Sequence, residues 1–364
     1  VAGITPFNFP AMVPKWMFPI AIAAGNTFIL KPSPLDPSAS LMIADLLTQA
    51  GLPDGVFNVV QGAAEVGQWL THHPEIAKVS FTGEVATGKK VMAAASSTLK
   101  DVTMELGGKS PVFIDTDADI ATAAARVLTV KTFNVGQICI APDYVLLPET
   151  ARDAFVEHAR TFVARTLPTL HDNPDYPSIV SDRHYRRLIG LLDDARARGA
   201  SVVGLEPAGE PHTDARTRKL APTLVLNPQE DMQVMQEEIF GPVLPVLTYH
   251  DPQQALDYIN AHPRPLAAYY FGNDPAQQQA FLESTTSGAA VINDVMTHAV
   301  VESVPFGGVG PSGIGAYHGI HGFRRFSHAK AVVVQSADGA SNLRLRAPYA
   351  DALAQARALL AGKA

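Results

Sequence analysis

The first hundred residues alternate between short apolar, β-branched runs and longer segments whose apolar residues recur at helical spacing. The motif KPSP at 31–34 and Gly51 separate segments of the two kinds. The pattern predicts strands at 27–30, 56–60, 78–81 and 101–106, and helices from a cap at 36–38 to Gly51, at 64–71 and at 83–97. Such βαβαβ order implies a parallel sheet covered by helices, with ligands at the carboxyl ends of the strands.

The same alternation continues beyond Gly107 and predicts a second α/β lobe. A polar stretch at 207–218 predicts an exposed loop. The remaining predicted elements are helices at 119–131, 183–198 and 347–361, and strands at 144–147, 243–248, 267–271, 289–292 and 331–335.

Composition narrows the class of protein. The 364 residues include 28 basic and 35 acidic side chains, with a net charge of −7 and 47% apolar residues. At about 150 residues per domain the length fits two or three domains, and the apolar content excludes general disorder. The absence of a basic block from the sequence argues against a nucleic-acid binder. The most apolar stretch, 16–30, contains proline and glycine and is shorter than the about 20 residues of a membrane-spanning helix.

The chain has one cysteine, Cys139, which excludes a disulfide framework and a multi-cysteine zinc site. We therefore expect a reducing, cytoplasmic location, no membrane partner and no metal. His318 and His321 lack a third ligand at a suitable spacing, which agrees with that expectation.

Gly83, Gly88 and Lys89 fit the spacing G-x-x-x-x-G-K between a predicted strand and a predicted helix. Backbone N–H groups at such a turn bind phosphate. A nucleoside-triphosphate loop needs Ser or Thr next, to reach Mg²⁺, but Lys90 occupies that position. A P-loop hydrolase, a plain turn and a site for a phosphate-bearing cofactor all stay open at this point.

Two further features have a structural interpretation as well as a chemical one. The glycines of 308–313 match G-x-G-x-x-G, but neither a clear strand nor a helix flanks them, so they predict a tight loop near another part of the structure. Cys139 lies between isoleucines, and Glu105 ends an apolar strand. Each is either a buried structural residue or a reactive group, a nucleophile and a base.

Taken together, an ordered series of motifs resembles the aldehyde dehydrogenase superfamily. The motifs are PFNFP (6–10), ILKPS (29–33), SFTGEVATG (80–88), ELGGKSP (105–111), GQIC (136–139), EEIFGPV (237–243) and PFGG (305–308). The resemblance implies an α/β fold with a Rossmann-like parallel sheet and a second α/β catalytic domain. It places a dinucleotide-binding domain at 1–106, a catalytic domain at 107–320, and an oligomerisation strand with a C-terminal tail at 321–364.

The resemblance also implies NAD- or NADP-dependent oxidation of an aldehyde to a carboxylic acid, in a homodimer or homotetramer. Cys139 would attack the aldehyde carbon to form a thiohemiacetal, which becomes a thioester. The Asn8 side-chain amide and the Cys139 backbone N–H would hold the oxyanion, and Glu105 would activate the hydrolytic water.

The same motifs imply a cofactor group and a substrate group. In the cofactor group, the turn at Gly83 would carry the pyrophosphate, Lys31 and Glu238 would bind ribose hydroxyls, and Phe240 would pack near the nicotinamide. The full cofactor group is Lys31, Gly83, Glu84, Gly88, Leu106, Glu238 and Phe240. The substrate group, an apolar tunnel whose members are otherwise ordinary core residues, is Met12, Trp16, Ile138, Ile140 and Phe306.

The sequence departs from the family pattern in three places. Pro34 stands where NAD-preferring members carry a glutamate that repels a 2′-phosphate, so NADP stays open. Glu84 stands where a serine is usual, and we expect its side chain to turn to solvent. The family's N-terminal segment does not precede Val1 in this sequence. We therefore expect the first strand to lack a sheet neighbour and expose an edge, which leaves a catalytically inactive fragment open as an alternative.

The motifs also resemble different branches of the family. Residues 1–28 resemble the methylmalonate-semialdehyde type and residues 81–111 betaine aldehyde dehydrogenases, whereas the chain from about residue 133 resembles the coniferyl-aldehyde and fatty-aldehyde branch, a pattern that fits a mosaic sequence. Glu105 favours release by water over transfer to coenzyme A. The substrate-facing lobe belongs to the third branch, so we expect an apolar or aromatic aldehyde, for example coniferyl aldehyde.

Overall fold

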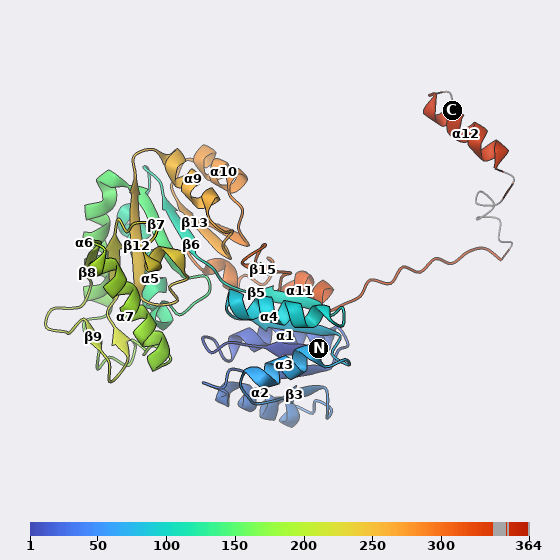
Figure 1. Cartoon of the computed structure of the whole chain (residues 1–364), viewed down its shortest axis with the longest axis horizontal. Coiled ribbons are helices and arrows are strands. Elements are labelled where there is room, and N and C mark those ends of the chain that lie inside the picture. The colour runs from blue at the N-terminus through green and yellow to red at the C-terminus, as the bar shows by residue number, and fades with distance from the viewer. Residues whose placement is uncertain (338–346, 348, 363–364) are drawn as a thin grey trace. The chain divides into compact units, whose positions relative to one another are not determined.

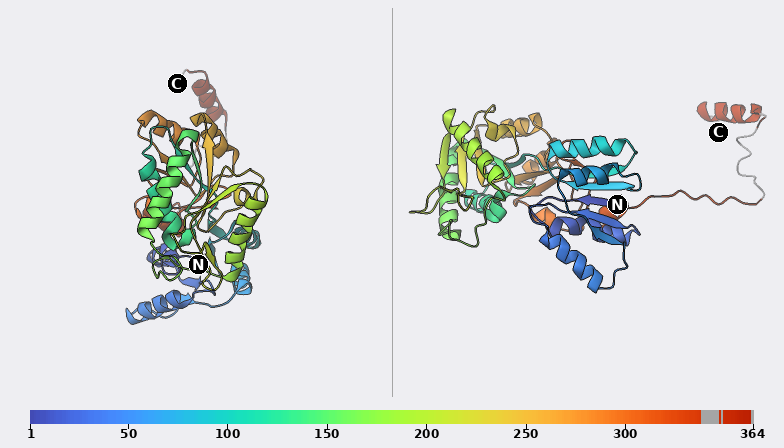
Figure 2. Two further views of the ribbon diagram at one scale, coloured as in Figure 1. Left: turned by 90° about the vertical axis from the view of Figure 1, so that its left-hand side faces the viewer. Right: turned by 60° about the horizontal axis from the view of Figure 1, so that its bottom comes forward.

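The computed structural model describes residues 1–337, 347 and 349–362, and the chain divides into two compact units, residues 1–327 and 328–364. In the first unit the strands form two main sheets, one mostly blue to cyan and the other mostly green to orange in Figure 1. Helices pack on both sheets, as two further views show (Figure 2). The predicted α/β fold class, with a Rossmann-like sheet and a second α/β sheet, is confirmed.

The first sheet consists of β1 (Ala2–Ile4), β2 (Phe28–Lys31), β3 (Phe57–Val59), β4 (Lys78–Thr82), β5 (Asp101–Glu105) and β15 (Gly313–Ile314). Its strand order is β15-β5-β4-β1-β2-β3, and β15 is its antiparallel member. Ala2 of β1 pairs with Ile29 on one side and with Val79 on the other. The expectation that the first strand exposes an edge is therefore wrong, because successive crossovers place β2 and β4 on opposite sides of β1.

The helices of this sheet are α1 (Met12–Ala23), α2 (Ser38–Gln49), α3 (Ala64–His72), α4 (Val85–Ser96) and α11 (Gly319–Arg325). The pattern at 16–30 did not predict α1, which contains both Pro14 and Pro19. Pro14 lies in the first turn of α1, where its missing N–H would have no helical partner. Pro19 lies inside the helix and is exposed.

The second sheet has the order β14-β13-β6-β7-β12-β11-β8 and is parallel except for β8. Its strands are β6 (Ser110–Ile114), β7 (Pro142–Pro148), β8 (Ser201–Gly204), β11 (Thr223–Leu226), β12 (Val243–Tyr249), β13 (Ala267–Phe271) and β14 (Ala289–Ile292), beside a small hairpin of β9 (Thr213–Asp214) and β10 (Lys219–Leu220). Its helices are α5 (Ile120–Thr132), α6 (Arg152–Thr166), α7 (Asp182–Ala197), α8 (Gln233–Gln236), α9 (Pro252–Ala261) and α10 (Pro275–Ser284), with 3₁₀ turns at Phe133–Gly136, Glu149–Ala151 and Thr297–Val300.

The loop at 308–313 confirms its prediction. A Cβ on Gly313 would meet the backbone oxygen of Met104 at 2.3 Å. Only a glycine at this position therefore lets β15 lie so close to β5. The Ser312 carbonyl accepts a hydrogen bond from the Leu106 N–H at 3.0 Å. The loop therefore fixes the end of β5, where Glu105 lies.

The second unit contains α12 (Ala350–Leu360), the predicted helix at 347–361, of which position 348 lies outside the described residues. Residues 331–335 do not form the predicted strand: they are exposed and unpaired within the described part of the chain. A strand exists only through a hydrogen-bonded ladder, and these residues have no partner strand there. No helix in the described ranges is both long and apolar enough to span a membrane.

Candidate active site

A cleft of about 550 Å³ opens between the carboxyl ends of the first sheet and loops of the second. This is the position that a parallel sheet predicts for its ligand. The cleft brings together most of the residues that the motifs singled out, from segments far apart in the sequence. Those that line it are Asn8, Lys31, Gly83, Glu84, Glu105, Leu106, Cys139, Glu238 and Phe240.

The loop that carries Cys139 requires glycine at position 136. Gly136 has a φ of +67°, and a Cβ there would meet the backbone oxygen of Gly241 at 2.4 Å. The Gln137 side chain then accepts a hydrogen bond from the Val180 N–H at 2.9 Å. These contacts fix the loop against the second lobe and hold Cys139 at the cleft.

Glu105, the last residue of β5, is 1% exposed. Burial raises the pKa of Glu105 to about 7, partly offset by the Cys139 thiol and the Gly107 backbone. Burial, together with the charges of Glu105 and Glu238, raises the pKa of the Cys139 thiol well above its ordinary value. The thiol therefore stays protonated at neutral pH until a base accepts its proton, and Glu105 lies beside it.

Asn8 lies between β1 and α1 and is buried at the cleft. The Asn134 side-chain amide donates a hydrogen bond to the Asn8 carbonyl at 3.0 Å. Asn134 begins the turn that leads to Cys139 and has a φ of +47°. This bond joins the segment after β1 to the cysteine loop.

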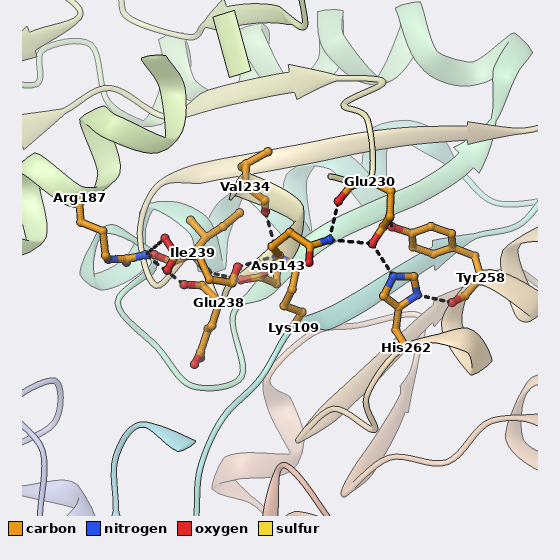
Figure 3. Close-up of polar contacts among 11 residues, drawn as sticks. Lys109, Asp143, Arg187, Glu230, Val234, Glu238, Ile239, Tyr258 and His262 are labelled. Carbon is orange, nitrogen blue, oxygen red and sulfur yellow. Dashed lines mark hydrogen bonds and ion pairs between the residues drawn. The ribbon is translucent and has the colours of Figure 1, made fainter. Parts of the chain in front are cut away.

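Lys109 fixes the segment that leads to Glu238 (Figure 3). Its ammonium forms an ion pair with Asp143 and donates to the carbonyls of Val234 at 3.0 Å and Glu237 at 2.9 Å. The other Asp143 oxygen accepts the Ile239 N–H at 2.9 Å. One partly buried ion pair therefore holds the segment by side-chain and backbone contacts on both sides of Glu238.

Arg187, on α7, donates to the carbonyls of Glu238 at 3.2 Å and of Ile239 (Figure 3). Phe240 follows with a φ of +49°, and its ring lies 5.9 Å from the Phe7 ring, edge to face. The arginine therefore supports a backbone that is strained at Phe240.

Glu238 points its carboxyl toward Gly107. Gly107 has a φ of +74°, and a Cβ there would meet Glu238 Oε1 at 2.8 Å. Burial first, and then the charges of Asp143 and Glu105, raise the pKa of Glu238 well above its ordinary value. The raised pKa favours the protonated carboxyl, which can both donate and accept hydrogen bonds.

The turn before α4 contains Gly83, which packs against the Phe81 ring. A Cβ on Gly83 would meet that ring at 2.7 Å. Glu84 is exposed, as expected, and its Oε1 accepts a hydrogen bond from the Thr87 hydroxyl at 2.7 Å. The carboxylate is therefore held over the first turn of α4, where the helix dipole stabilises negative charge.

Gly88 is not one of the residues that line the cleft. It packs beneath Leu106, whose Cδ2 a Cβ on Gly88 would meet at 2.4 Å, and so it lets α4 approach the end of β5. Lys89 and Lys90 are exposed on α4, and neither lines the cleft.

Several polar groups of the cleft suit a dinucleotide. The motifs predicted Lys31 as one of them, but they did not predict Thr5 and Thr82. Thr5 and Thr82, at the ends of β1 and β4, line the cleft, and their buried hydroxyls have no hydrogen-bond partner among the described residues. Lys31 Nζ donates to the carbonyls of Pro32 and Gly62, both at 2.8 Å. A ligand rich in hydroxyl and phosphate oxygens fits these groups. The position of both threonines at strand ends was the available signal.

The five residues of the predicted substrate group lie outside the cleft lining. Ile138, Ile140 and Phe306 are buried, whereas Met12 and Trp16 are half-buried. The rings of Trp16 and Phe306 lie 4.7 Å apart. Ile138, Ile140 and Phe306 belong to the large core of the first unit, and Trp16 packs against it.

A model of the aldehyde dehydrogenase family matches residues 1–332. The coniferyl aldehyde dehydrogenase of Pseudomonas sp. (strain HR199 / DSM 7063) is 50% identical over 353 residues, which cover 97% of this chain and 73% of the relative. The substrate-bound AldH structure of Staphylococcus aureus is 35% identical with a TM-score of 0.85, over 99% of this chain and 77% of that one.

Solved relatives differ in cofactor. One is described as an NADP-dependent enzyme of Escherichia coli (30% identical, TM-score 0.81) and another as an NAD-dependent aldehyde dehydrogenase of Sinorhizobium meliloti (33% identical, TM-score 0.82). Each match covers 90% of this chain, and 67% and 65% of the respective relative. The family match, the identity with the relatives and the shared fold agree that this chain belongs to the aldehyde dehydrogenase family.

Proposed function

We propose that the chain itself oxidises aldehydes to carboxylic acids, with Cys139 as the nucleophile. The observation that carries this proposal is the pairing of the half-buried Cys139 thiol with buried Glu105, whose pKa is about 7, in the cleft between the two sheets. An inert structural cysteine needs no carboxylate at its side. Burying a carboxyl group costs stability, so its presence beside the thiol favours a catalytic role.

In the first step Glu105 takes the thiol proton, and the Cys139 sulfur forms a bond to the aldehyde carbon. The carbonyl π electrons move onto oxygen. The Asn8 side-chain amide and the Cys139 backbone N–H stabilise this oxyanion, each donor contributing about 3–4 kcal/mol to lowering the barrier. The Asn134 bond to the Asn8 backbone supports that geometry.

When bound, NAD or NADP accepts a hydride from the substrate carbon. We assign the ribose hydroxyls to Lys31 and Glu238, the pyrophosphate to the turn at Gly83, and the nicotinamide side to Phe240. The unpartnered hydroxyls of Thr5 and Thr82 support a polar ligand here. We assign Leu106 to an apolar wall of the cofactor site. Glu84 occupies the N-cap position of α4 beside the proposed pyrophosphate site.

Before the second step Glu105 releases the thiol proton to solvent. It then takes a proton from water, which attacks the carbon of the thioester left after hydride transfer. The carbon–sulfur bond breaks, the carboxylic acid leaves, and Cys139 regains a proton. A buried carboxyl with a pKa near 7 suits both proton transfers because it is partly ionised at neutral pH.

We propose an apolar or aromatic aldehyde as substrate, with coniferyl aldehyde as a candidate because the relative at 50% identity carries that name. Met12, Trp16, Ile138, Ile140 and Phe306 are the proposed substrate walls. Their apolar character and the close contact between the Trp16 and Phe306 rings support an apolar or aromatic substrate.

We further propose a homodimer or homotetramer in which residues 331–335 add a strand to a second copy. Val332, Val333 and Val334 are 73%, 80% and 89% exposed, an apolar run with no ladder among the described residues. Light scattering on the wild type and on Val333→Lys tests this, since a charge in the ladder lowers the mass if the run pairs.

The test of the main proposal is a panel of aldehydes with NAD and with NADP, on the wild type and on Cys139→Ala. The wild type should form reduced cofactor with at least one aromatic or long apolar aldehyde, and the variant should not, although it still binds the cofactor by fluorescence titration. Turnover that survives in Cys139→Ala contradicts the proposal. Saturable cofactor binding without turnover in the wild type favours the inactive-fragment alternative.

A further inference from the structure

An aromatic cluster with two histidines lies beside the cysteine loop. The Phe306 ring lies 5.6 Å from the His298 ring, nearly parallel to it, and 5.5 Å from the His318 ring. Trp16 lies 4.7 Å from Phe306 and 5.3 Å from His318. We define the aromatic cluster as Trp16, Tyr269, His298, Phe306 and His318.

His298 is the unusual member of the aromatic cluster. Both of its ring nitrogens are buried, and neither has a hydrogen-bond partner among the described residues. Burial, with a smaller contribution from His318, lowers the pKa of His298 to about 4, so the ring is neutral and offers one N–H donor and one acceptor. Buried polar atoms are paired in the great majority of structures, so an imidazole with two free positions points to a ligand.

His318 differs, because hydrogen bonds with the backbone at Val301 and Val304 occupy it. One of its ring nitrogens remains without a partner in the described part of the chain. His318 therefore has a structural role that His298 lacks, and His298 is the better candidate for binding.

The position of His298 relative to Cys139 is set by Tyr269. The Tyr269 hydroxyl donates to the Ile140 carbonyl at 2.5 Å, one residue beyond Cys139, and its ring lies 6.4 Å from the His298 ring. Tyr269 therefore contacts the cysteine loop through its hydroxyl and packs near the His298 ring, so His298 lies within about one tyrosine side chain of the loop that carries Cys139.

We propose that His298 determines substrate specificity by accepting a hydrogen bond from the ring hydroxyl of a hydroxylated aryl aldehyde, while Phe306 and Trp16 pack against the ring. This inference rests on the proposed function, because the aldehyde carbon of the same molecule must reach Cys139. A site built to bind a hydroxyl discriminates strongly against the analogue that lacks it, since its own buried polar atom then stays unpaired.

The test compares 4-hydroxycinnamaldehyde with cinnamaldehyde, which differ in that hydroxyl alone. We expect the wild type to prefer the hydroxylated aldehyde about tenfold or more in kcat/KM. His298→Phe keeps the stacking on Phe306 and should bring the ratio to about one, because the acceptor for the ring hydroxyl is gone. His298→Gln, which retains an acceptor, should keep part of the preference. His158→Phe, at an exposed position, is the matched control and should keep all of it.

A wild-type ratio near one, or an unchanged ratio in His298→Phe, overturns the inference while the proposed function stands. No wild-type turnover of any aldehyde overturns the proposed function instead. If His298→Phe loses both activities, inhibition by 4-hydroxycinnamyl and cinnamyl alcohols decides. We expect the hydroxylated alcohol to inhibit the wild type at least about fivefold more tightly, and His298→Gln to reduce that difference; equal inhibition of the wild type contradicts the inference.

Discussion

Glu105 determines how the proposed reaction should depend on pH. Burial raises its pKa to about 7, and the ionised form is the one that accepts protons. Below pH 7 the carboxyl is protonated, so kcat/KM should fall about tenfold per pH unit, and above pH 7 it should level off. A pH profile of the wild type with a fixed aldehyde measures this, and a flat profile between pH 5.5 and 7 contradicts it.

The matched variant of that prediction is Glu105→Gln, which keeps the size of the side chain but cannot accept a proton. Steady-state turnover should fall about 10²- to 10⁴-fold, the usual contribution of a general base. A retained fold, checked by circular dichroism, excludes simple unfolding. Turnover within a factor of three of wild type would assign the base to another group.

At the scale of elements, the turn between α5 and Cys139 depends on Gly136. Gly136→Ala introduces a Cβ at 2.4 Å from the Gly241 oxygen at a φ of +67°. We expect a loss of at least about 2 kcal/mol in the free energy of unfolding, together with lower activity. Gly190→Ala on α7 is the control: nothing lies within 4 Å of its Cβ, and alanine should stabilise the helix by up to about 1 kcal/mol. Equal effects in denaturant titrations would contradict the structural difference.

Arg187 tests whether the segment at Glu238 needs external support. Arg187→Met removes the donors to the carbonyls of Glu238 and Ile239, and Phe240 keeps its strained φ without them. We expect the KM for the cofactor to rise about tenfold, whereas kcat at saturating cofactor changes less than threefold. Arg186→Met, on the exposed face of the same helix, should change neither. A fall in kcat alone would indicate a role in chemistry instead of positioning.

Helices and strands whose apolar residues recur at regular spacing could be predicted from the sequence, whereas elements fixed by tertiary packing could not. Residues 267–271 and 289–292 are strands with the predicted bounds. The helix α1 was missed because Pro19 interrupts its pattern, and the neighbours of β1 were missed because pairing depends on crossover order, which residue pattern does not encode. Residues 331–335 form no strand within the single chain because apolar character alone supplies no ladder, and the prediction that they form an oligomerisation strand stays a prediction.

In the candidate site, the sequence motifs predicted which residues take part, whereas only the fold shows which residues lie next to one another. Glu105 and Cys139 follow from short strings that the family resemblance singled out, and they line one cleft. Thr5 and Thr82 carry no motif, so their place at strand ends emerges from sheet topology. Arg187 lies among several arginines of α7, and sequence alone does not tell which one faces the segment at Glu238. The chemical roles of all these residues stay predictions.

At the scale of the whole molecule, residues from both halves of the first unit line the cleft. A ligand bound there therefore stabilises both halves against unfolding. A ligand at 100 times its Kd adds about 2.7 kcal/mol to the free energy of unfolding. Pro34 lines the cleft beside Lys31 and Ser33, at the position where a glutamate would repel a 2′-phosphate. Without that carboxylate, NAD and NADP should each raise the melting temperature by several degrees.

Pro34→Glu should abolish most of the NADP shift, because the new carboxylate would face a phosphate, and leave the NAD shift nearly unchanged. Leu35→Glu adds the same charge at a neighbouring, 54% exposed residue that is not part of the cleft lining, so it should preserve both shifts. Thermal denaturation with each cofactor, at matched ionic strength, measures all four combinations. If Pro34→Glu lowers both shifts equally, residue 34 acts on cofactor binding as a whole and not on the 2′-phosphate, and the assignment of this corner of the cleft to the adenosine ribose fails.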